Sequence, residues 1–215
     1  MQARPRLSPE LIVEAAARVA DRSGLDGVSM RTVARELGVE AMSLYHHVAN
    51  KEALLDALAD WIFTRIPPPD PTGPWRAALT RRWVDARATL AAHPWGLVLI
   101  ESRRTPGPAT LRQHDAVLGC LLGAGFPIAL AATAFSVLDA YVFGFVLTEQ
   151  TLPFEPGESA ADFVDSLALP TDDYPHLAAF IDAHVGPDYD HSDEFMIGLD
   201  LILDGLEQRL AAQAP

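Results

Sequence analysis

Apolar residues recur at helical spacing along almost the whole chain, and no segment keeps the strict alternation that a half-buried strand requires. Near the N-terminus, Ser8 and Pro9 mark a helix start, because serine is favoured at the N-cap and proline at the first helical position. Apolar residues then follow at helical spacing until Gly24, a residue type that ends helices. The pattern predicts an all-α protein.

Two short helices and a longer one are expected next. Ser29 caps a helix over about residues 30–37, and Gly38 ends it as a C′ glycine. A third helix is expected over about residues 41–47, and Asn50 caps a longer one that connects onward to about residue 66. Short helices joined by a tight turn, after a longer supporting helix, are typical of a helix-turn-helix, which we assign to residues 1–52.

The proline-rich run at residues 67–71 is the clearest boundary in the chain, since successive prolines forbid helix continuation. A second, larger helical domain is therefore expected over residues 67–215. Residues 150–191 are rich in proline, aspartate and glycine and are expected to be mostly loop, with short helical pieces at 163–169 and 175–184. The other helices of this domain are expected at about 74–92, 94–102, 108–124, 127–149 and 192–212.

The net charge of −13 argues at first against a protein that binds nucleic acid. The acidic residues are unevenly distributed along the chain, however. Residues 1–51 carry seven basic and six acidic residues, whereas residues 52–215 carry nine basic and 23 acidic ones. Because phosphate binding needs a local basic face and not a basic chain, the first segment remains compatible with DNA binding.

Cysteine usage and hydropathy indicate the compartment. Cys120 is the single cysteine, which excludes an internal disulfide and suits a reducing cytoplasm. The most apolar stretch, residues 128–147, is interrupted by Asp139 and Gly144 and therefore favours a buried helix over a membrane span. No apolar segment follows the N-terminal arginines, so no secretory signal is expected. We predict a cytoplasmic protein with no membrane association.

The start of the third helix is the candidate DNA-reading surface. Val33, Leu44 and Val48 are expected to close the small core, which leaves a mostly uncharged surface that can enter a major groove. Arg31 and Lys51 lie near helix N-termini, where they can hold flanking phosphates. The expected reading residues are Ala41, Met42, Ser43, Tyr45, His46 and His47.

The stretch from Val28 to Val39, followed by Ser43–Val48 and Asn50–Leu55, resembles the signature of the TetR family of repressors over about residues 8–60. The resemblance implies base or phosphate contacts from the eight residues just named. Tyr45 has an alternative role as a cap on the small core. A metal site at His46 and His47 is not expected, because adjacent residues on a helix point about 100° apart.

Residues 70–210 resemble, more loosely, the tetracycline-repressor type of C-terminal domain. The resemblance implies an all-helical effector-binding domain that dimerises through the last two long helices of each subunit, and a dimer would read a palindromic operator. One apolar stripe on the final helix supports a dimer, and Gly198 and Gly205 would admit a second helix. The expected interface residues are Phe195, Leu199, Ile202 and Leu206.

Aromatic and polar residues of the larger domain are candidates for an effector pocket, since such sites combine apolar walls with a few polar groups. Asp139 is the most informative, because an acid inside an apolar helix needs a partner, a proton or solvent. It either binds a cationic ligand or pairs with an arginine such as Arg104. The candidates are Trp83, Arg87, Trp95, Leu99, Arg103, Arg104, His114, Val117, Phe135, Asp139 and Phe143.

Ile100 and Thr148 occupy the positions at which family members that recognise a magnesium–tetracycline chelate use histidine and glutamate, so neither that chelate nor any cofactor or metal is expected. The leading hypothesis is a repressor released by a small hydrophobic effector. An activator or a ligand-independent regulator is the alternative within the same fold. An enzyme with a DNA-binding-like head is disfavoured, because no G-x-S-x-G elbow, Walker A loop or paired metal-ligand spacing is present.

Overall fold

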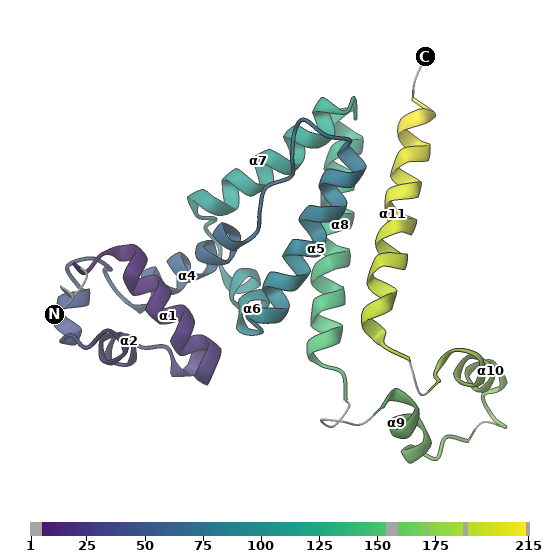
Figure 1. Ribbon diagram of the computed structural model, residues 1–215, viewed down its shortest axis with the longest axis horizontal. Helices are drawn as coiled ribbons and strands as arrows, with labels where there is room; N and C mark the ends of the chain where they lie inside the picture. The colour runs from purple at the N-terminus through teal and green to yellow at the C-terminus, as the bar shows by residue number, and fades with distance from the viewer. Residues whose placement is uncertain (1–5, 154–158, 171, 187–188, 214–215) are drawn as a thin grey trace.

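The computed structural model describes residues 6–153, 159–170, 172–186 and 189–213, and within these residues all regular structure is helical (Figure 1). The expected all-α class is confirmed. The head consists of α1 (Pro9–Ser23), the 3₁₀ turn η1 (Leu25–Gly27), α2 (Met30–Leu37) and α3 (Ala41–Leu44).

The predicted caps of the head are confirmed by their hydrogen bonds. The Ser8 side chain accepts from the Leu11 amide, and Ser29 and Thr32 form a reciprocal capping box at the start of α2. Gly38 ends α2 with φ of 66°, a left-handed conformation that glycine adopts without a Cβ clash. These caps set where each short helix begins and ends, and so where α3 starts.

The third helix is shorter than expected. We predicted helix to about residue 47, but α3 ends at Leu44 and residues 45–47 form a turn. The amides of His47 and Val48 both donate to the Leu44 carbonyl oxygen at 2.9 Å, which closes the chain on itself before Asn50 caps the next helix.

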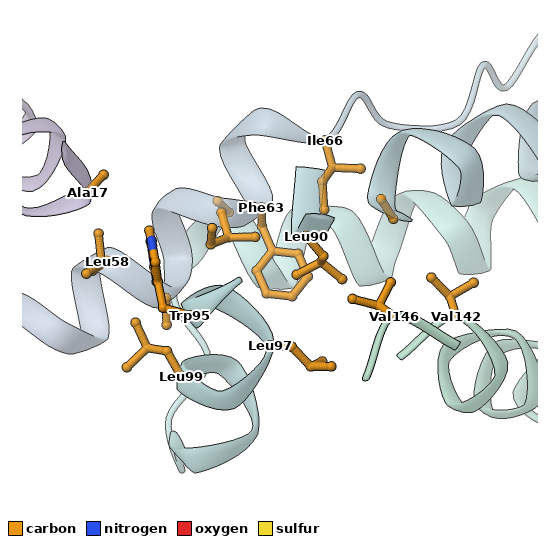
Figure 2. Packing of buried hydrophobic residues seen from close by; sticks show 14 of the residues in the cluster. Ala17, Leu58, Phe63, Ile66, Leu90, Trp95, Leu97, Leu99, Val142 and Val146 are labelled. Carbon is orange, nitrogen blue, oxygen red and sulfur yellow. The ribbon is translucent and has the colours of Figure 1, made fainter. Parts of the chain in front are cut away.

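The connecting helix α4 (Lys51–Arg65) runs from the head into the larger domain. It packs against α1 on the head side and against α6 (Trp95–Ser102) and α7 (Pro108–Gly123) on the other. Figure 2 shows Leu58, Phe63 and Ile66 of this segment pointing into the same apolar cluster as Leu90 and Trp95. The head and the larger domain therefore share a continuous core through α4.

The larger domain is built around α8 (Ile128–Gln150), which packs against α5 (Trp75–Ala92), α7 and α11 (Glu194–Ala211). Two short helices, α9 (Ala160–Ser166) and α10 (Pro175–His184), lie beyond one end of α8 and α11, and η2 (His191–Asp193) leads into α11 (Figure 1). Among the described residues, α8 is the one helix long and apolar enough to cross a membrane, but it buries Leu138, Val142 and Val146 against its neighbours. Burial on that face is what a core helix requires.

Candidate functional site

The predicted DNA-reading residues lie on the surface of the head. Met42 is 71% exposed and Tyr45 46% exposed, whereas Leu44 between them is fully buried. Arg31, His46, His47 and Lys51 are exposed, and Ala41 and Ser43 are partly so. The exposure of Tyr45 is more than its alternative role as a core cap needs. The geometry leaves all eight residues accessible to a nucleic acid.

Two of the basic residues of the head are used internally. The Arg18 Nε atom donates to Glu36 at 3.0 Å, and Arg22 reaches the same carboxylate at 2.5 Å, which ties α1 to α2. Arg31 and Lys51 form no ion pair with any described residue. Together with Arg35, which is also exposed and forms no ion pair among the described residues, they are the cations of the turn-helix region that remain available for phosphate.

A cavity of about 200 Å³ lies where α4, α6, α7 and α8 meet. Five of the eleven predicted pocket residues line it, and two unpredicted neighbours, Phe63 and Ile100, contribute apolar wall. The predicted residues are Arg103, Arg104, His114, Asp139 and Phe143.

Aromatic rings gather around His114 at this cavity. Phe135 and Phe63 both meet the His114 ring edge-on, with centroids 5.0 Å and 6.2 Å away. Burial, with a smaller contribution from nearby Arg82, lowers the pKa of His114. A neutral imidazole among phenyl rings suits a flat aromatic ligand.

Asp139 is the predicted acidic residue among those that line the cavity, which also include Asp56, Asp60 and Glu101. Burial raises its pKa from 3.8 to about 6, against the opposing effect of the Arg82 charge. The expected pair with Arg104 is absent, since no basic group in the described part of the chain lies within ion-pair distance of Asp139. The carboxyl therefore faces the cavity without a bound counter-ion, and an incoming cation or hydrogen-bond donor would stabilise its charged form.

The other six predicted pocket residues are not among those that line this cavity. Trp83, Leu99 and Val117 are almost completely buried in the core, and Phe135 touches the cavity only through His114. Trp95 is buried and donates to Asp21. Arg87 pairs with Glu149 and lies over the ring of Phe195, next to a separate hollow. Aromatic residues at helical spacing serve the core as well as a pocket, so the pattern does not separate the two.

Three polar links join the head and α4 to the larger domain. The Asp21 carboxylate accepts from the Trp95 indole and meets the His93 ring, both at 2.7 Å. Arg103, at the end of α6, reaches Glu52 at 2.9 Å. The Asp60 carboxylate accepts from the amides of residues 109 and 110, and so caps the N-terminus of α7.

Gly107 allows the third link to form. A Cβ atom at this position would lie 2.3 Å from the Cγ atom of Asp60, so only glycine permits the loop before α7 to approach α4 this closely. The sequence analysis missed Asp60 and Gly107, because one lies in the connecting helix and the other in a loop. A glycine directly before Pro108 at a helix start was the available signal.

The apolar residues of α11 that we expected at the dimer interface are mostly buried within one subunit. Phe195, Leu199 and Leu206 are buried against α8 within the same subunit, and Ile202 is partly buried. Gly198 admits the Tyr141 side chain of its own chain, and Gly205 faces open space. Helical periodicity defines an apolar face but not which molecule covers it. The apolar residues left exposed on α11 are Met196, Ile197 and Leu201.

Comparison with known proteins finds two family matches. Residues 12–58 match the family described as "Bacterial regulatory proteins, tetR family", and residues 67–210 match "Tetracyclin repressor-like, C-terminal domain". The HTH-type transcriptional repressor DrrR1 of Streptomyces coeruleorubidus is 36% identical, over 99% of this chain and 83% of that protein. The class A tetracycline repressor from transposon 1721 of Escherichia coli is 34% identical, over 95% and 92%.

Solved structures show the same architecture. ActR from Streptomyces coelicolor, in its apo form, superposes with a TM-score of 0.79 at 27% identity, covering 99% of this chain and 100% of that one. ActR in complex with actinorhodin has a TM-score of 0.79 at 27% identity, covering 96% and 99%.

Proposed function

Because the chain belongs to the TetR family of bacterial regulatory proteins, we propose that it represses transcription as a homodimer on a palindromic operator and leaves that DNA when a small-molecule effector occupies the cavity beside Asp139. It is a regulator and not an enzyme. Residues 1–52 form the DNA-binding head, α4 connects it onward, and residues 67–215 bind the effector and form the dimer. We place the protein in the cytoplasm, where its DNA target lies and Cys120 stays reduced.

The observation that carries this proposal is the double role of α4. Lys51, at its first turn, is available for phosphate, while Phe63 and Asp60, near its other end, line the cavity. A helix rises about 1.5 Å per residue, so a rigid α4 spans roughly 18 Å between the two functions. An effector that moves the cavity wall moves Lys51 and α3 with it, and so shifts the equilibrium between DNA-competent and incompetent states.

The cavity chemistry indicates the class of effector. Phenyl rings and a neutral imidazole favour a flat aromatic body, and the Asp139 carboxyl favours a cationic or hydrogen-bond-donating substituent. The solved complex of ActR with actinorhodin supports a small-molecule effector for this fold.

Selection of binding sites from random DNA with the purified protein tests the function. We expect a palindromic consensus whose half-site centres lie one helical turn, roughly 34–36 Å, apart. If the protein enriches no sequence at moderate salt, the proposal is wrong.

Single substitutions in the head separate affinity from sequence choice. Lys51→Ala is expected to weaken binding to every sequence alike and to reduce the slope of log affinity against log salt by about 2, because the homodimer loses one phosphate contact from each subunit. Met42→Ala is expected to change the preferred bases while leaving that slope unchanged. Arg112→Ala, an exposed arginine on α7, is the control and should alter neither quantity. A Lys51→Ala slope equal to that of the control would contradict the phosphate role.

Removing the charge of Asp139 is expected to stabilise the protein in a pH-dependent way. The folded-state pKa of about 6 lies above the unfolded value of 3.8, so the ionised carboxylate destabilises the fold above pH 6 and not below pH 4. Asp139→Asn should therefore raise the free energy of unfolding by about 3 kcal/mol at pH 7.5, and this gain should vanish as the pH falls from 6 to 4. Urea denaturation across this range measures it, with the exposed Asp115→Asn as control. A gain independent of pH would exclude an uncompensated carboxylate.

A further inference from the structure

A second, larger hollow lies between the head and the larger domain, outside the cavity beside Asp139. It is a groove of about 580 Å³, bounded by α1, by the outer side of α4 and by the loop at residues 105–108. Its apolar surface comes from residues such as Val13, Trp61 and Pro106. The volume falls in the range of small-molecule sites, and the loop at residues 105–107 is a wall of both hollows.

The charged residues that line the groove are mostly acidic. Glu10 and Glu14 lie four residues apart on α1, and Asp56 and Asp60 lie four residues apart on α4, so each helix presents a pair of like charges on one face. Such pairs destabilise a helix. Arg65 is the one basic residue among those that line the groove.

Two of the four carboxylates have partners of their own within the protein, one shares its partner, and one has no basic partner in the described part of the chain. Glu14 pairs with Arg65, and Asp60 caps α7. Glu10 has no basic partner within ion-pair distance among the described residues, and hydrogen bonds from its own amide and from Ser8 lower its pKa, which keeps it ionised. Asp56 lies 3.4 Å from an Arg103 nitrogen that is closer to Glu52, at 2.9 Å. One guanidinium thus serves two carboxylates, and the part of the groove near Glu10 and Asp56 keeps a net negative charge.

The other part of the groove shows how a cation is held. The Arg65 guanidinium lies over the Trp61 ring, 4.4 Å from its centroid, while pairing with Glu14. This combines an aromatic face with a carboxylate, the arrangement that recognises organic cations. Glu10 and Asp56 offer a carboxylate from each wall of the same groove, and Arg103, which contacts Asp56, is not among the residues that line it.

We propose that this groove is a second binding site, for an organic cation with a flat apolar body whose charge lies between Glu10 and Asp56. The site is distinct from the cavity beside Asp139, since it lacks that residue and the aromatic wall, although Asp56, Asp60 and the loop at residues 105–107 border both hollows. A ligand there contacts α1, α4 and the loop at residues 105–108 together, and so bridges the head and the larger domain.

The experiment uses the full-length protein without DNA, so that its result does not depend on the repressor function. N-methylacridinium is the cationic probe and acridine, uncharged at pH 8, is its neutral counterpart; binding is followed by probe fluorescence, and the Trp61 indole signal is followed by NMR. We expect the cation to bind more tightly than acridine and to shift the Trp61 signal. The double variant Glu10→Gln/Asp56→Asn should weaken cation binding about tenfold and leave acridine binding unchanged.

Two controls locate the site. Asp115→Asn/Asp182→Asn removes two exposed acids from outside the groove, and should leave cation binding at the wild-type level. Asp139→Asn measures any share of the cation that binds in the cavity instead, since that cavity also favours a flat cationic ligand. The proposal is overturned if the cation fails to bind, if acridine binds equally well, or if the Asp139→Asn variant loses binding while the groove variant keeps it. Denaturation midpoints of all variants establish that each is folded.

Discussion

Leu201→Glu is expected to yield a folded monomer that binds the operator more weakly than the wild-type dimer, on the order of a hundredfold or more. Leu201 is 70% exposed on α11, and Ile197, one turn earlier, is 57% exposed. Val137 and Leu147 extend this apolar surface onto α8, beside Gly144, which has open space above it. In the proposed dimer this face is removed from water, so a glutamate in it would be buried without a partner. Loss of the second head then removes half of the DNA contacts.

Analytical ultracentrifugation and an operator titration measure the two effects together. Leu111→Glu is the matched control, because Leu111 is also exposed, at 54%, but lies on α7 away from the α8 and α11 surface. We expect that variant to remain a dimer with wild-type affinity. A dimeric Leu201→Glu protein would show that the subunits meet through another surface.

Gly107→Ala is expected to lower the free energy of unfolding by about 2 kcal/mol, because the added methyl group displaces Asp60 from the N-terminus of α7. Asp60→Ala should cost a similar amount, and the double variant should cost little more than either alone, since both changes remove one interaction. Denaturation at a fixed protein concentration measures all three, as the dimer makes stability concentration-dependent.

Gly119→Ala tests the same chemical change inside α7, the helix that follows Gly107, without the contact. No heavy atom lies within 4 Å of a Cβ atom at Gly119, so alanine there should be neutral or stabilising, through its helix propensity. If Gly107→Ala behaves like Gly119→Ala, the link between α4 and α7 contributes nothing. If instead the two costs at Gly107 and Asp60 simply add, the residues act separately.

The local chemistry of the head could be predicted from sequence to within a few residues. Serine and asparagine caps, a proline at N1 and a C′ glycine act over three or four residues, so Ser8, Ser29, Gly38 and Asn50 indicate their helix ends without any tertiary information. The exception is the end of α3, because the turn after Leu44 has no such signal.

The larger domain shows where this reasoning fails. The stripe of Phe195, Leu199 and Leu206 has the same period whether α8 of the same chain or a second subunit covers it, and the structure assigns it to α8. Likewise Trp83 and Phe143 look alike in sequence, but only the packing of four helices makes one of them core and the other cavity wall.

The sequence by itself therefore determined the helical class, the helix boundaries of the head apart from the end of α3, and the exposure of its candidate reading residues, because these depend on contacts between near neighbours in the chain. Only the tertiary structure decided that Asp139 is a buried acid without an ion pair, that Asp60 approaches Gly107, and which face of α11 is exposed. Each of these depends on residues some 40 or more positions apart that meet only when the helices pack. Contacts at such a separation leave no periodic pattern in the sequence from which they could be predicted.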